Sequence, residues 1–517
     1  MARFRVLVVV VLGGLTACAP KSRPLAQPGP TPAMRMALAD DQVKAGCLDC
    51  LEQAFQEYVA LQSHSTLGAS ARESALRTAL LIAVRENELG LLDSGRLQQA
   101  RELMPSPSAT LSLLIDVADA LSAKSRGPAR STSTDAENRA SVRISRTQAQ
   151  WAPALRQLMP DDLLADYLWL GLACGPYGFD VPDRADRAAL VGDRLDIPLI
   201  RFKAASSCAI QRPELGALRD ANARFAETHY FLGVSALSTQ LLAGADEAET
   251  EFQMAYAWRP NWPTLTMAIA SVALTAENFD RAIEFYGNTL ALVPDYPDAL
   301  LGVMRAFTYA GQHTEAIAAA DRLLAINRNP GEARYWRALN EEQADQHDAA
   351  WIDIERAAEG MVSPDVPKLA GIIAINRRQL DVARQRLELS LSARSTDCET
   401  AFYLQAVITQ QGQWAEAARV ASNAAACFDA DLTRLSSELE SLRVAEMRAD
   451  QRDRQIARRE QQIRSETRMR AASWYDAAAS HYNLAQRDQA RRFAEKLLDD
   501  EQYRDRARDL LARLTAQ

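Results

Sequence analysis

Seven cysteines and five histidines are the side chains of this 517-residue sequence that could carry metal, redox or nucleophilic chemistry. The histidines are scattered, and no HExxH, P-loop, GxGxxG or GxSxG motif accompanies them. Isolated histidines on helices are more often surface or packing residues than catalytic ones. The sequence therefore predicts no enzyme activity, no cofactor and no metal centre. The five are His64, His229, His313, His347 and His481.

The segment Cys47-Leu48-Asp49-Cys50 is a CxxC motif with three possible interpretations. Redox activity requires an exposed helix start in a βαβ setting, which the helical surroundings lack. A zinc site requires two further ligands, and His64 is the only close candidate. We favour a structural disulfide between Cys47 and Cys50, and the redox and metal interpretations stay open.

The N-terminus predicts the compartment. Arg3 and Arg5 precede an apolar stretch at 6–15, which is too short to span a bilayer as a mature helix and fits a signal peptide. The next residues, Leu15-Thr16-Ala17-Cys18, resemble a bacterial lipobox. The resemblance implies a lipoprotein signal peptide at 1–17 and acylation of Cys18; the alternative is an ordinary secretory leader. Because Ala19 follows and not Asp, the resemblance to enteric lipoproteins implies an outer-membrane anchor facing the periplasm.

Four regions follow the leader. A proline-rich stretch at 18–37 predicts an extended tether. Helical spacing of apolar residues begins soon after it and predicts an N-terminal helical region at 38–225, with degenerate repeats and a flexible loop near 124–145. Six repeats are expected at 226–429. Residues 430–517 are expected to form a long charged helix, a final hairpin and a capping helix.

Alanines recur through the middle of the chain at separations of 34, 34, 34, 33 and 34 residues. Such a period is typical of a solenoid of helical hairpins. A small residue is needed at each crossing because a larger side chain would push the two helices apart. The alanines are Ala248, Ala282, Ala316, Ala350, Ala383 and Ala417.

The repeats resemble the tetratricopeptide repeat (TPR) family. One of them reads Pro297-Asp298-Ala299-Leu300, followed by Val303, Phe307, Gly311 and Ala316, at positions where the family has apolar and small residues. The resemblance implies an all-α solenoid of helical hairpins wound into a right-handed superhelix. The fourth repeat departs from the pattern, with Arg334, Arg337 and Glu341 at expected core positions. We expect its first helix to rotate so that Tyr335, Trp336 and Leu339 face inward.

In the TPR family the first helices of the repeats line a concave groove, and their fifth position often faces it. The resemblance therefore implies a partner groove, and the alternative is that several of these side chains pack between repeats. The positions carried over are Met267, Leu301, Tyr335, Lys368, Phe402 and Tyr475, with Gly233 in the first repeat.

Six cysteines remain if Cys18 is acylated, and an even number in an exported chain suggests disulfides. Cys398 and Cys427 lie 14 residues before and 15 residues after Gly412, a turn residue. Two antiparallel helices of that length bring both ends back to one height, about 22 Å from the turn. We therefore expect them to pair. Cys174 and Cys208 are another expected pair.

The net charge of the chain excludes some classes of function. The net charge of −8 argues against a general nucleic-acid binder. The excess of +3 in residues 446–470 is expected to be a solvated face and not a contact with an acidic partner. We expect a scaffold or adaptor that binds another envelope protein, since known periplasmic TPR lipoproteins assist assembly or secretion. The alternative is a glycan-capture lipoprotein using Trp258, Trp262, Tyr256 and Trp336.

Overall fold

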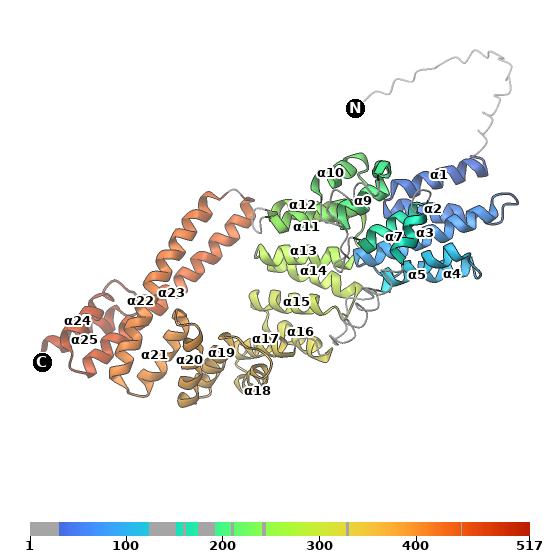
Figure 1. Ribbon diagram of the computed structural model, residues 1–517. Helices are drawn as coiled ribbons and strands as arrows, with labels where there is room; N and C mark the ends of the chain where they lie inside the picture. Colours follow the sequence, from blue (N-terminus) through green and yellow to red (C-terminus); the bar gives the residue numbers. More distant parts are fainter. Residues whose placement is uncertain are drawn as a thin grey trace, which may run out of the picture.

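The structure, a computed structural model, describes residues 30–123, 151–158, 162–173, 192–207, 211–239, 244–326, 330–445 and 447–516. These residues form helices and turns and contain no strand. Successive helices stack side by side into an elongated, curved array (Figure 1). The predicted all-α solenoid of helical hairpins is therefore confirmed. Within the described ranges, every helix is too short or too polar to cross a bilayer.

The N-terminal region is helical, as expected, but it begins inside the predicted tether. Helix α1 starts at Pro32 because Thr31 caps it and proline is tolerated in the first turn. The leader, most of the tether and the predicted loop lie outside the described residues. The elements are α1 (Pro32–Ala45), α2 (Leu48–Leu61), α3 (Gly68–Leu89), α4 (Arg96–Leu103), α5 (Ala109–Ala123), α7 (Leu163–Ala173), η1 (Gly192–Asp196), α9 (Pro198–Ser207) and α10 (Arg212–Ala221).

Six hairpins follow at the expected places, and the six repeated alanines are each 0% exposed. All six lie in the second helices, where any larger side chain would enter the first helix of the hairpin. The pairs are α11 (Ala226–Thr239) with α12 (Gly244–Trp258), α13 (Pro263–Thr275) with α14 (Phe279–Leu292), α15 (Pro297–Tyr309) with α16 (His313–Ala325), α17 (Pro330–Gln343) with α18 (His347–Ala358), α19 (Asp365–Asn376) with α20 (Leu380–Ala393), and α21 (Cys398–Gln410) with α22 (Trp414–Val444).

Five of these hairpins turn through one residue with positive φ: Glu277 at 58°, Gly311 at 73°, Asp345 at 59°, Arg378 at 59° and Gly412 at 70°. This left-handed conformation ends the first helix and lets the chain reverse. Gly412 therefore occupies the turn assigned to it from the sequence.

The expected rotation in the fourth repeat is wrong, because Arg337 and Glu341 both keep their core positions: Arg337 is ion-paired there, and Glu341 is buried with one carboxylate oxygen unpartnered. Glu341 is only 7% exposed. The guanidinium of Arg337 binds Asp353, which is 2% exposed, and lies 2.5 Å from Asp321 on the neighbouring repeat. Tyr335, Trp336 and Leu339 are only half-buried. Ion pairing thus keeps the helix in the register of the other repeats.

The expected long charged helix forms, but the leucine stripe before it lies on a different helix, because the chain turns between the two. Helix α22 ends at Val444, and α23 (Ala449–Asn483) runs back along it. Leu435 and Leu439 are 0% and 8% exposed between the two helices, so the leucine stripe closes a hairpin. We call residues 429–444 and 447–470 the arm. A final hairpin of α23 with α24 (Arg487–Glu495) and the cap α25 (Arg504–Ala516) follow, as expected.

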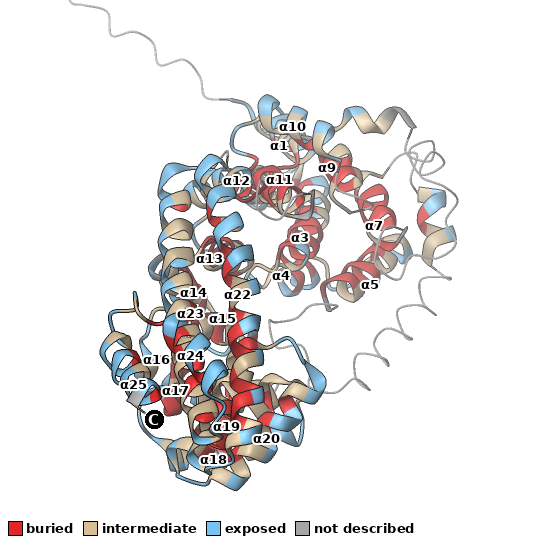
Figure 2. Cartoon of the chain, turned by 90° about the vertical axis from the view of Figure 1, so that its left-hand side faces the viewer, coloured by how far each residue is buried: buried red, intermediate tan, exposed pale blue. Residues whose placement is uncertain are grey.

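The predicted boundary at 225/226 is not a break in the core. Buried apolar residues from Ala39 to Ala320 form one continuous cluster, visible as the buried interior in Figure 2. Trp262 is 0% exposed and donates its indole N–H to the carbonyl of Leu89, 2.7 Å away. The N-terminal region and the first repeats therefore share one hydrophobic core.

Candidate partner-binding face

The six predicted groove residues are all half-buried: none is fully exposed, and none is in the core. Met267 and Leu301 pack against the main core cluster. Lys368 forms ion pairs within the chain, since its ammonium lies 2.7 Å from Glu399 and 3.2 Å from Asp397. The groove assignment stays a prediction, and these three side chains are partly engaged already.

The aromatic groove positions also have internal partners. Phe402 lies 6.5 Å from Phe428 of the next helix, and Tyr475 lies 5.3 Å from Tyr503, measured between ring centroids. Burial, with Asp365 nearby, raises the pKa of Tyr335 to about 12. Gly233 cannot face a groove, because a Cβ there would come within 2.5 Å of the Phe252 ring.

A row of rings that the sequence reasoning missed lies along the turn edge of the repeats. Phe279 begins α14, Tyr309 ends α15, and Trp336 is in α17. Their centroids are 5.6 Å apart for Phe279 and Tyr309, and 5.9 Å apart for Tyr309 and Trp336. Tyr309 is 46% exposed at the middle of the row. We call these three residues the aromatic row.

The arm returns to this edge of the array. Figure 1 shows α22 and α23 rising away from α21 until their tip meets α12. Arg448 at the tip pairs with Glu249, 2.5 Å away, and its backbone N–H lies 3.3 Å from Asp246. Further along, Arg458 lies 3.2 Å from Glu277. The arm therefore bridges back to the first repeats and closes a loop of helices.

The expectation that the basic excess of this segment is simply solvated is thus wrong for Arg448 and Arg458. A signal was present in the sequence: α12 carries Asp246, Glu247 and Glu249 close together, opposite in sign to the arm. Charge alone did not identify the pairing, since the two segments are 202 residues apart at Arg448 and Asp246.

The CxxC motif lies at the start of α2, where Cys47 is the N-cap. Cys47 and Cys50 form a disulfide, with Cα atoms 5.0 Å apart. Cys47 is 2% exposed and packs with Phe202, Phe225 and other apolar residues. A buried first cysteine favours the structural interpretation over redox exchange, which needs an accessible thiolate. Among the described residues, no cluster of three His, Cys, Asp or Glu could hold a metal ion.

Cys398 and Cys427 also form a disulfide, with Cα atoms 5.4 Å apart at the base of the α21–α22 hairpin. This is the pairing expected from their distances to Gly412. Cys18, Cys174 and Cys208 lie outside the described residues, so acylation and the remaining pair stay predictions.

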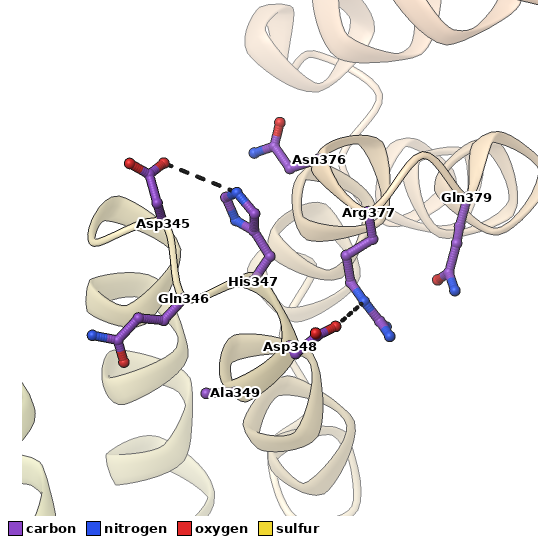
Figure 3. Close-up of a pocket in the computed structure, with 8 residues that line it drawn as sticks. All are labelled: Asp345, Gln346, His347, Asp348, Ala349, Asn376, Arg377 and Gln379. Carbon is purple, nitrogen blue, oxygen red and sulfur yellow. Dashed lines mark hydrogen bonds and ion pairs between the residues drawn. The ribbon is translucent and has the colours of Figure 1, made fainter.

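A polar pocket of 550 Å³ lies between the turns of the fourth and fifth repeats (Figure 3). His347 points toward Asp345 in the close-up, and its Nδ1 lies 2.9 Å from Glu342. The Arg377 guanidinium is 3.0 Å from Asp348. The pocket is thus lined by polar side chains, several of which pair with one another.

The rings proposed for glycan capture do not gather on one exposed face. Trp262 is completely buried, and Tyr256 packs edge-on against Phe285, 5.3 Å away. Trp258 is 45% exposed under the guanidinium of Arg224. Trp336, the fourth ring, stands edge-on to Tyr309 and Tyr335. Sugar stacking needs open ring faces side by side, which the four rings do not provide.

The fold and this face define a helical-hairpin solenoid whose exposed features suit protein contacts. The model of the family described as tetratricopeptide repeat matches residues 273–341, from α13 into α17, so the chain contains TPR repeats. Curated proteins give no match to the sequence.

Solved structures of TPR proteins resemble parts of this chain at low identity. MamA is 21% identical, covering 32% of this chain and 92% of its own, with a TM-score of 0.30. YrrB, described as a TPR protein with an unusual peptide-binding site, is 16% identical, covering 34% and 91%, with a TM-score of 0.30. A TPR protein from Parabacteroides merdae is 15% identical, covering 56% and 99%, with a TM-score of 0.35.

Proposed function

We propose that this protein is a membrane-anchored TPR scaffold, facing the periplasm, that binds a protein partner of envelope assembly or secretion. The anchor is the acylated Cys18, on the basis of the Leu15-Thr16-Ala17-Cys18 motif. Several acyl chains hold a protein at a membrane without a spanning helix.

One observation carries the binding role: Tyr309 is 46% exposed in the middle of the aromatic row. Tyrosine and tryptophan supply much of the binding energy at protein interfaces because their large rings lose little conformational entropy. Arg305 adds a guanidinium 5.6 Å from the Trp336 ring. Aromatic and arginine side chains together are typical of interface centres and not of a general solvated surface.

Site-specific photocrosslinking tests this proposal in cells. A photoreactive phenylalanine analogue at Tyr309 should give one dominant protein adduct. The same analogue at Ile352, which is 54% exposed on α18, is the matched control and should give none. Equal adducts at both positions, or none at Tyr309, would contradict a binding role for the aromatic row.

A further inference from the structure

The place where the arm meets the first repeats has the chemistry of an arginine site. Glu277 provides a carboxylate 3.2 Å from Arg458. The rings of Phe279 and Tyr309 each lie 5.4 Å from the same guanidinium. A planar guanidinium can pair with a carboxylate and lie over rings together, whereas an ammonium group is a compact, strongly hydrated point charge.

Negative charge continues from this point to the tip of the arm. Glu249 lies between two guanidinium groups, 2.8 Å from Arg281 and 2.5 Å from Arg448. Asp246 accepts the backbone N–H of Arg448. One oxygen of Glu277 is shielded from solvent and has no hydrogen-bond partner. The acidic side of the contact can therefore accept further donors, which favours a basic ligand.

The arm holds this site through two exposed arginines that meet partly buried carboxylates. The side chains of Arg458 and Glu277 are 45% and 29% exposed, and that of Arg448 is 41% exposed. Ion pairs of this kind contribute little to stability and weaken in salt. Tyr309 keeps 46% of its surface exposed with the arm in place. The contact is therefore specific in chemistry but weak enough to be exchanged.

We propose that Asp246, Glu249, Glu277, Phe279 and Tyr309 form a docking surface for an arginine-bearing segment of the partner protein. The arm fills this surface within the chain, and a partner arginine displaces Arg458. This inference rests on the proposed function and specifies the chemistry of its partner. A partner can touch the exposed part of Tyr309 with the arm in place, but it must replace Arg458 to take the position beside both rings that this guanidinium occupies.

The test uses the full chain in detergent and a labelled peptide with the arm sequence of residues 447–464. The variant Arg448→Glu with Arg458→Glu vacates the surface, so it should bind the peptide at least roughly tenfold more tightly than the unmodified chain. A peptide with lysine at every arginine should bind roughly tenfold more weakly, because it loses the planar contact. Adding Glu277→Lys to the vacated variant should remove binding.

The matched control is Arg419→Glu with Arg508→Glu, which makes the same charge change at two side chains that are each 65% exposed. Neither residue belongs to the arm, so this control should bind like the unmodified chain. Arg458→Ala serves if the double reversal disturbs folding, because it only shortens one exposed side chain. Equal affinity for the vacated and unmodified chains, equal affinity for the two peptides, or indifference to Glu277→Lys would overturn the proposal.

Two further outcomes separate related ideas. If the chain forms a dimer that the arm peptide dissociates in sedimentation, the occupant is the arm of a second copy and not a different protein. If Tyr309 crosslinks a partner in cells while the vacated surface ignores the arginine peptide, the scaffold proposal stands and the arginine assignment fails. If the vacated surface binds the arginine peptide but Tyr309 gives no cellular adduct, the arginine assignment stands and the scaffold proposal fails.

Discussion

Arg85 and Glu227 form an ion pair from which solvent is excluded. The Arg85 guanidinium lies 3.3 Å from the Glu227 carboxylate, and the two side chains are 0% and 1% exposed. The same carboxylate accepts the backbone N–H of Leu48, 2.8 Å away, at the start of α2. Phe202 lies 4.0 Å from the guanidinium and covers it. One acidic side chain of the first repeat thus joins two helices of the N-terminal region to the solenoid.

Replacing Glu227 by Gln should therefore lower the free energy of unfolding by about 3–5 kcal/mol, because Arg85 keeps its charge in a site closed to water and loses its directly paired carboxylate. Glu247→Gln is the control: it breaks a surface pair with Arg212, with Glu247 49% exposed, and should cost about 1 kcal/mol or less. Denaturant unfolding of the two variants gives the comparison. Similar small losses in both would show that the buried pair does not hold the regions together.

The repeats could be predicted from the sequence because one local requirement recurs. Ala248 and its five counterparts must be small wherever they occur, so the spacing of a single residue type revealed the period, the hairpins and the turn at Gly412. The Cys398–Cys427 pairing followed from the same geometry. Local rules of this kind depend on a residue and its close neighbours in the chain.

The arm and the fourth repeat could not be predicted in the same way, because their contacts depend on residues distant in sequence. Glu341 is a poor core residue by type, and its place is explained only by Arg337, Asp353 and the neighbouring repeat. Arg458 has an ordinary surface sequence, and only the turn after Val444 brings it to Glu277. A leucine stripe can pack against a neighbouring helix or against a helix that the same chain forms after a turn. The pattern therefore did not predict the turn after Val444.

Glu341 should make stability depend on pH. Burial, with Asp353 nearby, raises the pKa of Glu341 from 4.5 to about 7. Between these values the unfolded chain releases a proton that the folded chain retains, so the free energy of unfolding falls as pH rises from 4.5 to 7. Glu341→Gln removes this effect. The stability of this variant relative to the unmodified protein should therefore be about 3 kcal/mol more favourable at pH 8 than at acidic pH.

Melting temperatures of Glu341→Gln and the unmodified protein at about pH 4 and pH 8 check this prediction. Other raised carboxyl groups, such as Asp166 with a pKa of about 7, titrate in both proteins and cancel in the difference. A difference between the two proteins that does not change with pH would contradict the assignment.

The predicted groove has its own test in Tyr335→Ala combined with Phe402→Ala. If these half-buried rings contact a partner, the double variant should no longer capture it. The loss in the free energy of unfolding at each site should stay below the value typical of a buried aromatic, about 3–5 kcal/mol. Val362→Ala, at a position 105% exposed, is a control for substitution at the surface. Outright unfolding of the double variant would show that the two rings are core residues.

Anchoring depends on one residue. Cys18→Ala removes the thiol that acylation would modify, so the protein should either leave the membrane fraction or accumulate with its leader attached. Cys208→Ala is a control that removes a different cysteine. Membrane fractionation with mass spectrometry of the N-terminus gives the answer, and a mature variant that still sediments with the outer membrane would refute the lipobox interpretation.

The Cys398–Cys427 disulfide links the compartment to the stability of the solenoid, because only an exported chain is expected to retain it. It closes a loop of 29 residues, whereas Cys47–Cys50 spans 3. In the loop-entropy model the longer loop contributes roughly 3–4 kcal/mol and the shorter one about 1.5 kcal/mol. Cys398→Ser with Cys427→Ser should therefore lower the melting temperature more than Cys47→Ala with Cys50→Ala.

In the variant without the Cys398–Cys427 bond, hydrogen exchange should increase mainly in α21 to α25 and little near Ala248, since each repeat is stabilised mainly by its neighbours. Peptide mapping without reductant should recover the crosslink from envelope-purified protein; free thiols at both positions would contradict the bond and weaken the case for export.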